Sequence, residues 1–156
     1  MGSPKVSVII PAYNHARYLG EAVESALGQT HGDVEVVVVD DGSTDGTDAL
    51  VADRYASSVI YVRQENRGLP SARNTGLARS TGDHLVFLDA DDHLTPDCLE
   101  KKVEVLERRP EVGWVFSDLY LTDEEGKVTG RWSERLHYFR RQLRGQIFGE
   151  LLMGNF

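Results

Sequence analysis

The chain has 156 residues and a single cysteine, Cys98, so it can form neither an internal disulfide nor a metal site built from several cysteines. One free cysteine is typical of a reducing compartment. No run approaches the roughly 18 consecutive apolar residues that a transmembrane helix needs. The first residues also lack the apolar core of a signal peptide. We therefore expect a cytoplasmic protein.

Basic residues are also scarce, with 17 Lys and Arg against 25 Asp and Glu and a formal net charge of -8. This balance argues against general nucleic-acid binding, which needs a basic face. The absence of a Gly-x-Gly-x-x-Gly segment after the first apolar run argues against a dinucleotide-dependent oxidoreductase. An acidic protein can still bind a phosphorylated ligand when a divalent cation lies between carboxylates and phosphates.

Buried β-branched runs alternate with segments of helical periodicity, and the length is that of one domain covering residues 1–156. Strands are predicted at 6–10, 34–39, 59–62, 84–88 and 112–121, with a short return strand near Val128, and helices at 16–29, 47–54, 68–81 and 95–109. This order predicts an α/β fold, a three-layer α/β/α sandwich around a mostly parallel, Rossmann-like sheet.

Two acidic loops follow predicted strands, at residues 40–43 and 89–92. Ligands of parallel sheets bind at the carboxyl ends of the strands, where both loops would lie. Placing Asp89, Asp91 and Asp92 together costs about 1 kcal/mol or more per close pair, which Mg²⁺ or Mn²⁺ would offset. The alternative is that these carboxylates only form turns and cap helices. Two acidic loops at one edge favour the cation.

Six segments carry a resemblance to a known family. They are Val6–Asn14 (VSVIIPAYN), Ser25–Thr30 (SALGQT), Val38–Thr47 (VVDDGSTDGT), Asn66–Gly68 (NRG), Ala72–Gly76 (ARNTG) and Leu88–Asp92 (LDADD). In this order and spacing, residues 4–121 resemble the donor-binding core of family 2 glycosyltransferases of the GT-A fold, which transfer sugars from nucleotide diphosphates. Each segment alone is weak evidence, but the series is specific.

The resemblance implies roles by position. The donor-binding residues that it implies are Pro11, Ala12, Tyr13 and Asn14 near the base, Asp41 bonded to the base, Asn66, Gly68 and Arg73 bordering the nucleotide, and Asp89, Ala90 and Asp91 as an Asp-x-Asp signature. Asp91 is the first choice as metal ligand. Asp92 and Asp89 would contact the metal, the ribose or the donor sugar. A carboxylate at Asp41 that accepts the N3–H of uracil would favour UDP or dTDP over CDP.

The resemblance also implies an inverting transfer to a saccharide, a lipid-linked acceptor or another hydroxyl. No carboxylate after Leu121 lies in a context that identifies the catalytic base. We therefore expect this chain to be the N-terminal donor-binding portion of a longer enzyme. Residues 122–156 would form a hairpin and an amphipathic helix that lead to an absent acceptor half.

Alternatives stay open for the function of the chain and for the role of its last segment. A binding-only module would keep the nucleotide site without turnover, and a receiver-like domain would use the acidic loops as a phosphoacceptor pocket. The receiver is disfavoured because its acidic pair follows the first strand, whereas Asp40 and Asp41 follow the second. The amphipathic segment 138–153, with its arginines, is expected to pack on protein. Its alternatives are peripheral contact with the inner face of the membrane and self-association into a homo-oligomer.

Overall fold

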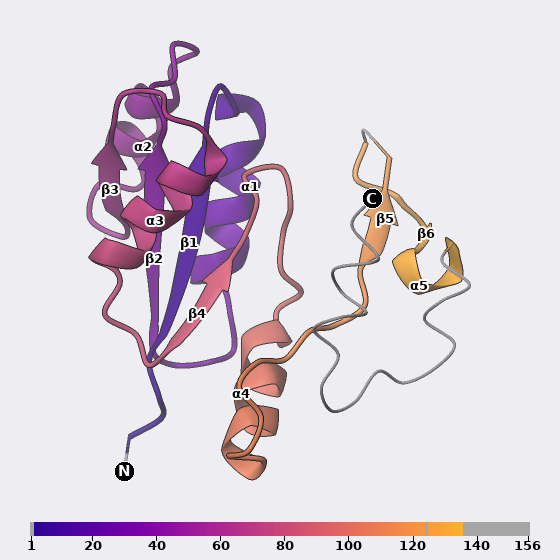
Figure 1. Ribbon diagram of the computed structural model, residues 1–156. Coiled ribbons are helices and arrows are strands. Elements are labelled where there is room, and N and C mark those ends of the chain that lie inside the picture. Colours follow the sequence, from indigo (N-terminus) through magenta and orange to yellow (C-terminus); the bar gives the residue numbers. More distant parts are fainter. Residues whose placement is uncertain (1, 124, 136–156) are drawn as a thin grey trace. The chain divides into compact units, whose positions relative to one another are not determined.

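The computed structural model describes residues 2–123 and 125–135 (Figure 1). The chain divides into two compact units, Met1–Trp114 and Val115–Phe156. The first unit contains a four-stranded sheet and the second a two-stranded one. Because the predicted donor-binding residues lie between positions 11 and 92, the first unit carries the candidate site.

The first unit alternates strands and helices as predicted. Its elements are β1 (Val6–Ala12), α1 (Ala16–Leu27), β2 (Val34–Asp40), α2 (Thr47–Arg54), β3 (Ile60–Arg63), α3 (Leu69–Arg79), β4 (His84–Phe87) and α4 (Cys98–Arg108). The strand order is β3-β2-β1-β4 and every pairing is parallel. The predicted α/β architecture with a parallel central sheet is therefore confirmed.

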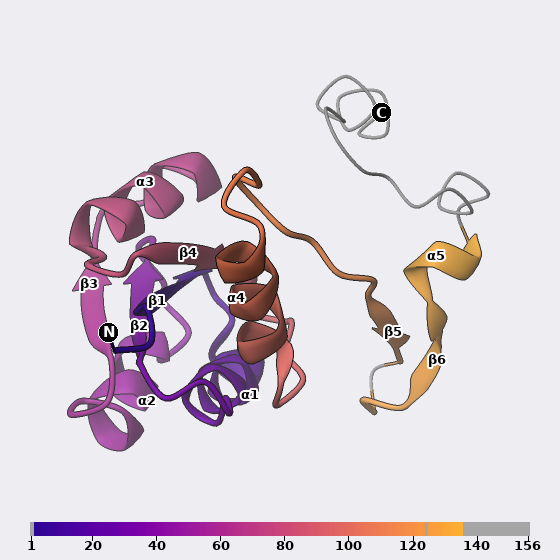
Figure 2. The same ribbon diagram turned by 90° about the horizontal axis from the view of Figure 1, so that it is seen from below.

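Helices cover both faces of this sheet. Helix α3 lies on one face, and α1 and α2 lie on the other (Figure 2). Val8 and Ile10 of β1 point into the larger core with α1, α2 and α4, whereas Ile9 points into the smaller core with Ala72 of α3. Burial on both faces explains why β1 and β2 are continuous apolar runs rather than alternating ones.

The packing of α3 against β1 depends on a glycine. A Cβ atom added at Gly76 would lie 2.2 Å from Cγ2 of Ile9, well inside van der Waals contact. The last residue of the Ala-Arg-Asn-Thr-Gly segment is therefore explained by helix–sheet packing, without a contact to any ligand.

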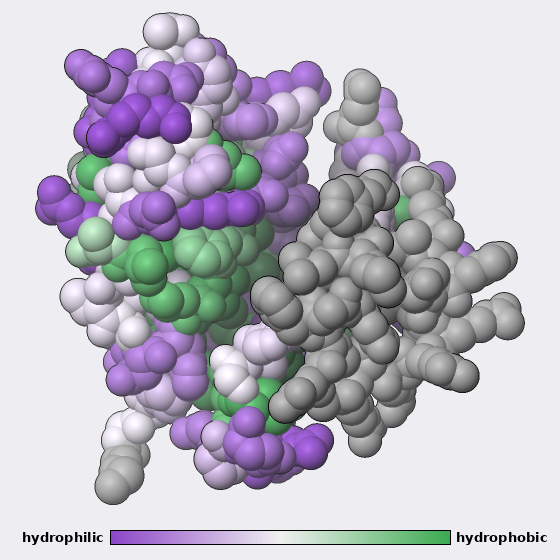
Figure 3. Space-filling view, in the orientation of Figure 1, coloured by the Kyte–Doolittle hydropathy of each residue, from purple (hydrophilic) through white to green (hydrophobic). Residues whose placement is uncertain are grey.

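Strand β4 differs from the fully buried strand that its sequence predicts. Leu85 and Phe87 remain 44% and 47% exposed, because α3 packs over β1 and β2. Figure 3 shows hydrophobic side chains gathered over α3 and β4 on this face. Within residues 2–123 and 125–135, β4 pairs only with β1 and forms the edge of the sheet.

The predicted strand at 112–121 is wrong over most of its length. The second unit has only β5 (Tyr120–Thr122), which pairs antiparallel with β6 (Val128–Arg131) before α5 (Trp132–Arg135). Aromatic and β-branched residues favour a strand, but a strand also needs a neighbour to pair with, and residues 112–119 pair with none of the described strands. The return strand near Val128 is confirmed.

Two further comparisons with the sequence concern helices. Helix α4 begins at Cys98 rather than near Thr95. The amphipathic segment 138–153 lies outside the described residues. In the part of the chain that the structure describes, no helix has the length and apolar character needed to cross a membrane.

Candidate functional site

The loops after β1, β2 and β4 emerge at one edge of the sheet, because all three strands are parallel. The start of α3 connects two of these loops. The Gly68 N–H donates to Oδ2 of Asp41 at 2.8 Å, and Nη2 of Arg73 donates to Oδ1 of Asp89 at 2.9 Å. Five residues of helix rise roughly 8 Å. Asp41 and Asp89 therefore lie around the first turns of the same helix.

Asp41 is buried and its carboxylate is held by three donors. Oδ1 accepts hydrogen bonds from Nε2 of Gln64 at 2.6 Å and from the Arg67 N–H at 3.0 Å, and Oδ2 accepts the bond from Gly68. Burial alone would raise the pKa of Asp41, but the bonds from Arg67, Gln64 and Gly68 outweigh it and hold the pKa below its usual range. The ionised carboxylate has about four acceptor positions, and these bonds occupy two on Oδ1 and one on Oδ2.

Asp40, the preceding residue, is fully buried and is compensated inside the protein. Its Oδ1 accepts the Ser43 N–H at 2.7 Å, and its Oδ2 accepts the Tyr61 hydroxyl at 2.6 Å. Nε of Arg63 lies 3.8 Å from the same Oδ2. The loop after β2 therefore does not depend on a cation to tolerate its two adjacent carboxylates.

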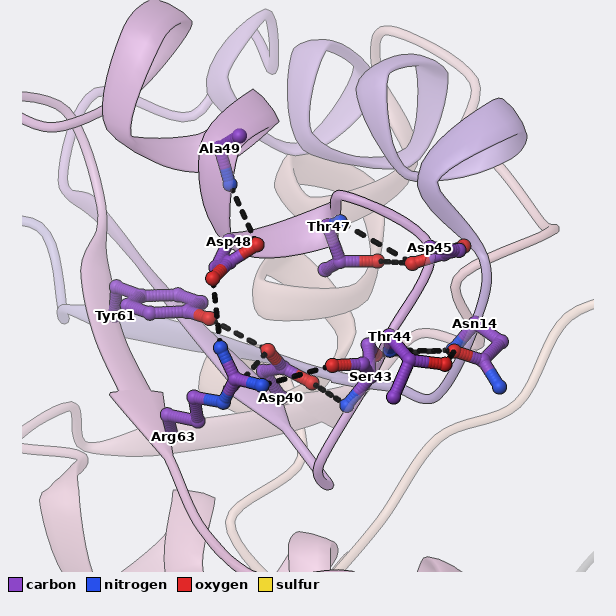
Figure 4. A network of polar contacts seen from close by, with 10 residues as sticks. All are labelled: Asn14, Asp40, Ser43, Thr44, Asp45, Thr47, Asp48, Ala49, Tyr61 and Arg63. Carbon is purple, nitrogen blue, oxygen red and sulfur yellow. Dashed lines mark hydrogen bonds and ion pairs between the residues drawn. The ribbon is translucent and has the colours of Figure 1, made fainter.

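Asn14 joins the loop after β1 to the loop after β2. Its backbone N–H donates to Oγ of Ser43 at 3.0 Å, and its Oδ1 accepts the Thr44 N–H at 2.8 Å (Figure 4). Asn14 has a φ of 56°, in the left-handed region that asparagine tolerates better than most residues. The side-chain oxygen of Asn14 therefore accepts a hydrogen bond from within the protein. The resemblance had implied only a position near the base.

The loop after β4 is electrostatically different. Asp89 pairs with Arg73, whose guanidinium lies 5.6 Å from the centre of the Phe87 ring. Asp91 and Asp92 are exposed, and among the described residues their carboxylates have no hydrogen bond or ion pair. Partial desolvation raises the pKa of Asp92, the nearby Asp91 and Asp89 raise it further, and His93 lowers it by a smaller amount. The net effect is that the ionised carboxylate of Asp92 is disfavoured, as expected where negative charge is in excess.

The neighbouring cation, Arg73, is also incompletely satisfied. Its Nε is buried, and within residues 2–123 and 125–135 it has no hydrogen-bond partner. An unpaired buried donor is costly, and such a group commonly marks a position where a ligand or water binds. The edge thus carries both an unpaired donor and two unpaired carboxylates.

No group of three His, Cys, Asp or Glu side chains is arranged to hold a metal ion in the described part of the chain. Mg²⁺, however, binds through one or two carboxylates together with phosphate oxygens and waters. Asp91 and Asp92 fit that donor set, since both are exposed and uncompensated. Asp89 fits it less well, because Arg73 already holds one of its oxygens.

The remaining predicted donor-binding residues lie on these same loops. Pro11 and Ala12 are buried at the end of β1, and the Ala12 carbonyl accepts the Asp41 N–H at 2.9 Å. Tyr13 and Asn66 are exposed, whereas Ala90 is buried. The sequence did not indicate three residues that hydrogen-bond to the loop after β2. Tyr61 and Arg63 lie in β3, and Gln64 directly follows it. Two polar side chains in a strand of four residues were the available signal.

The comparisons with known proteins agree with this arrangement. Residues 7–153 match the model of the glycosyl transferase family 2. An uncharacterised glycosyltransferase of Nostoc sp. is 44% identical over 127 residues, which are 80% of this chain and 39% of the relative. The chain thus spans about two fifths of that relative's length.

Two solved structures are similar to more than half of this chain. S. aureus TarS 1-349 in complex with UDP has a TM-score of 0.63 at 32% identity, over 68% of this chain and 33% of that one. The mannosyltransferase PcManGT from Pyrobaculum calidifontis, in complex with GDP-Man and Mn²⁺, has a TM-score of 0.54 at 37% identity, over 60% and 29% of the two chains. Given the family match along nearly the whole sequence, the chain belongs to glycosyl transferase family 2.

Proposed function

We propose that this chain binds the nucleotide-sugar donor, favouring a UDP- or dTDP-sugar, for metal-dependent, inverting transfer of the sugar to a saccharide or another hydroxyl acceptor. In this proposal, the catalytic base and the acceptor site belong to a part of the enzyme that lies outside the described residues. A longer protein is in keeping with the Nostoc relative, of which this chain covers 39%.

The observation that carries the proposal is the set of unpaired polar groups on the loop after β4 and in the first turns of α3. Asp91 and Asp92 remain uncompensated, while the buried Nε of Arg73 has no partner among the described residues. A nucleotide diphosphate with its cation supplies both missing partners, since the cation binds the carboxylates and a phosphate oxygen accepts the N–H of the unpaired Nε of Arg73. Asp91 and Asp92 would hold the cation, which would supply Lewis-acid stabilisation of the departing diphosphate.

The preference for uracil rests on Asp41. Its ionised carboxylate has one acceptor position left, and the N3–H of uracil or thymine can donate to it, whereas cytosine has no proton there. The similar proteins were solved with UDP and with GDP-Man, so the base has to be tested directly on this chain.

We expect UDP and dTDP to raise the melting temperature more than CDP at equal concentration with Mn²⁺ present. Affinity ratios of about tenfold or more would correspond to one charge-assisted hydrogen bond. A thermal-shift titration of the three nucleotides measures this ranking. Equal shifts for UDP and CDP would show that Asp41 does not select the base. Its hydrogen bond with the Gly68 N–H would then be purely structural.

Turnover separates the transferase from a binding-only module. The measurement is release of UDP from a UDP-sugar by this chain and by a longer protein that contains it, with the same acceptor mixture. Release by the longer protein supports the proposal. A longer protein that binds UDP with Mn²⁺ but releases none from any UDP-sugar would favour the binding module.

A further inference from the structure

The loop of residues 41–46 has no regular secondary structure, yet it carries the carboxylate assigned to the base. Gly42 and Gly46 adopt φ values of 82° and 91°, and Ser43 is buried at its centre. Backbone of this kind keeps one conformation only if side chains from elsewhere fix it. Asn14 holds it from the side of β1, as described above.

The other side of the loop is held from β3. We propose that Tyr61 and Arg63 are positioning residues for donor binding: they touch no donor atom, but fix the loop 41–46 and thereby the carboxylate of Asp41. This proposal rests on the proposed function, since it assigns the loop to the donor. Tyr61 and Arg63 are two residues apart in one strand, which places both side chains on the same face of the sheet.

Tyr61 acts through Asp40. Its hydroxyl donates to Oδ2 of Asp40 at 2.6 Å, while Oδ1 of the same carboxylate accepts the Ser43 N–H. Burial, followed by the bond to Asp40, raises the pKa of Tyr61, so the phenol remains a neutral donor at physiological pH. The tyrosine thus orients a fully buried carboxylate that in turn holds the loop backbone.

Arg63 makes two further contacts, one to the loop and one to the helix that follows it. Its Nη2 donates to the Ser43 carbonyl at 2.8 Å, and its Nη1 pairs with Oδ2 of Asp48 at 2.7 Å, beyond the loop at the start of α2 (Figure 4). Ser43 is therefore fixed at three atoms: its N–H by Asp40, its carbonyl by Arg63 and its Oγ by Asn14. Asp41 lies between Asp40 and this fixed serine, so its position follows from theirs.

The chain offers matched controls for both side chains. Tyr55 also donates its hydroxyl to a carboxylate, Oε1 of Glu24 at 2.9 Å, and is buried, whereas Tyr61 is partly buried. Arg54 pairs with the same Glu24 and is 50% exposed, compared with 46% for Arg63. Both control pairs join α1 to α2 away from the loop. Tyr55→Phe and Arg54→Gln therefore remove the same kinds of bond as Tyr61→Phe and Arg63→Gln.

The first readout is UDP affinity with Mn²⁺, measured by calorimetry at a temperature where all four variants are folded. If the competent loop conformation falls to about a tenth of the population, the apparent dissociation constant rises about tenfold. We expect that rise for Tyr61→Phe and Arg63→Gln, and less than a twofold change for Tyr55→Phe and Arg54→Gln. Wild-type affinity in the β3 variants, or equal weakening in all four, would overturn the proposal.

The second readout needs no nucleotide. Hydrogen exchange of the Ser43 amide, whose N–H is bonded to Asp40, should be at least about tenfold faster in Tyr61→Phe and unchanged in Tyr55→Phe. If the wild-type chain bound no UDP, the proposed function would fail while this exchange result would still decide whether β3 fixes the loop. Unchanged exchange at Ser43 in Tyr61→Phe would overturn that claim on its own.

Discussion

Replacing Asp91 by alanine should lower the affinity for UDP in the presence of Mn²⁺ about a hundredfold, and should leave the much weaker affinity without Mn²⁺ unchanged. Asp91 is exposed and uncompensated among the described residues, so it is free to bind a cation. Removing one carboxylate from a site that has one or two protein ligands leaves the cation held by little more than the diphosphate. Calorimetric titration of UDP with Mn²⁺ or with a chelator measures both affinities.

The control is Asp53→Ala, which removes the same charge from an exposed position on α2. A drop in affinity that came only from altered net charge would appear in both variants. The Asp91 assignment would be contradicted by an Asp91→Ala chain whose UDP affinity still depends on Mn²⁺ as strongly as that of the wild type.

Replacing Glu35 by glutamine should lower the free energy of unfolding by about 3 kcal/mol at pH 7. This carboxylate, 11% exposed, pairs with Nζ of Lys5 at 2.6 Å and accepts hydrogen bonds from Ser7 and Thr81. Burial opposes its ionisation, but the bonds from Lys5, Ser7 and Thr81 outweigh that cost and lower the pKa from 4.5 to about 2. A shift of this size corresponds to about 3 kcal/mol by linkage.

The pH dependence gives a second check on Glu35. A group whose pKa is lower in the folded chain contributes its full stability above the unfolded value, here 4.5, and loses it as the pH falls toward about 2. The difference between wild type and Glu35→Gln should therefore shrink from about 3 kcal/mol at pH 7 to about 1 kcal/mol at pH 3. Urea unfolding at each pH measures it.

The matched control is Glu104→Gln on α4. Glu104 pairs with Arg108 one turn away, and the two side chains are 51% and 75% exposed. Exposed pairs of this kind contribute less than about 1 kcal/mol. Equal losses of unfolding free energy in Glu35→Gln and Glu104→Gln would contradict this account. They would show that the contacts of Glu35 with Lys5, Ser7 and Thr81 do not stabilise the fold more than an exposed pair does.

The sequence predicted the order of the elements well wherever the pattern is local. Each of the first four strands is a short apolar run ended by polar or glycine residues, and α1 shows its buried face directly through Leu19, Val23 and Ala26. The strand expected at 112–121 fails because a strand depends on a pairing partner, which no local pattern reveals. The exposure of Phe87 in β4 also depends on tertiary structure, because α3 packs over β1 and β2 instead of β4.

The candidate site was predictable in location and only partly in detail. The segments after β1, β2 and β4 could be placed at one edge because parallel strands share their direction. Their internal contacts could not be placed, since the partners are distant in sequence: Tyr61 lies 21 residues from Asp40, and Gln64 lies 23 from Asp41. The sequence placed Asp41 at the base and the cation at Asp89, Asp91 and Asp92, but it did not reveal that donors within the protein compensate Asp40 and Asp41.

The central claim is that the carboxylates after β4 bind a divalent cation together with a nucleotide diphosphate. Titration of UDP into the wild-type chain, with Mn²⁺ and then with the metal chelated, tests it most directly. We predict saturable binding with the metal present and a loss of at least about a hundredfold in affinity on chelation. Binding of equal strength in both conditions, or no binding in either, would contradict the claim.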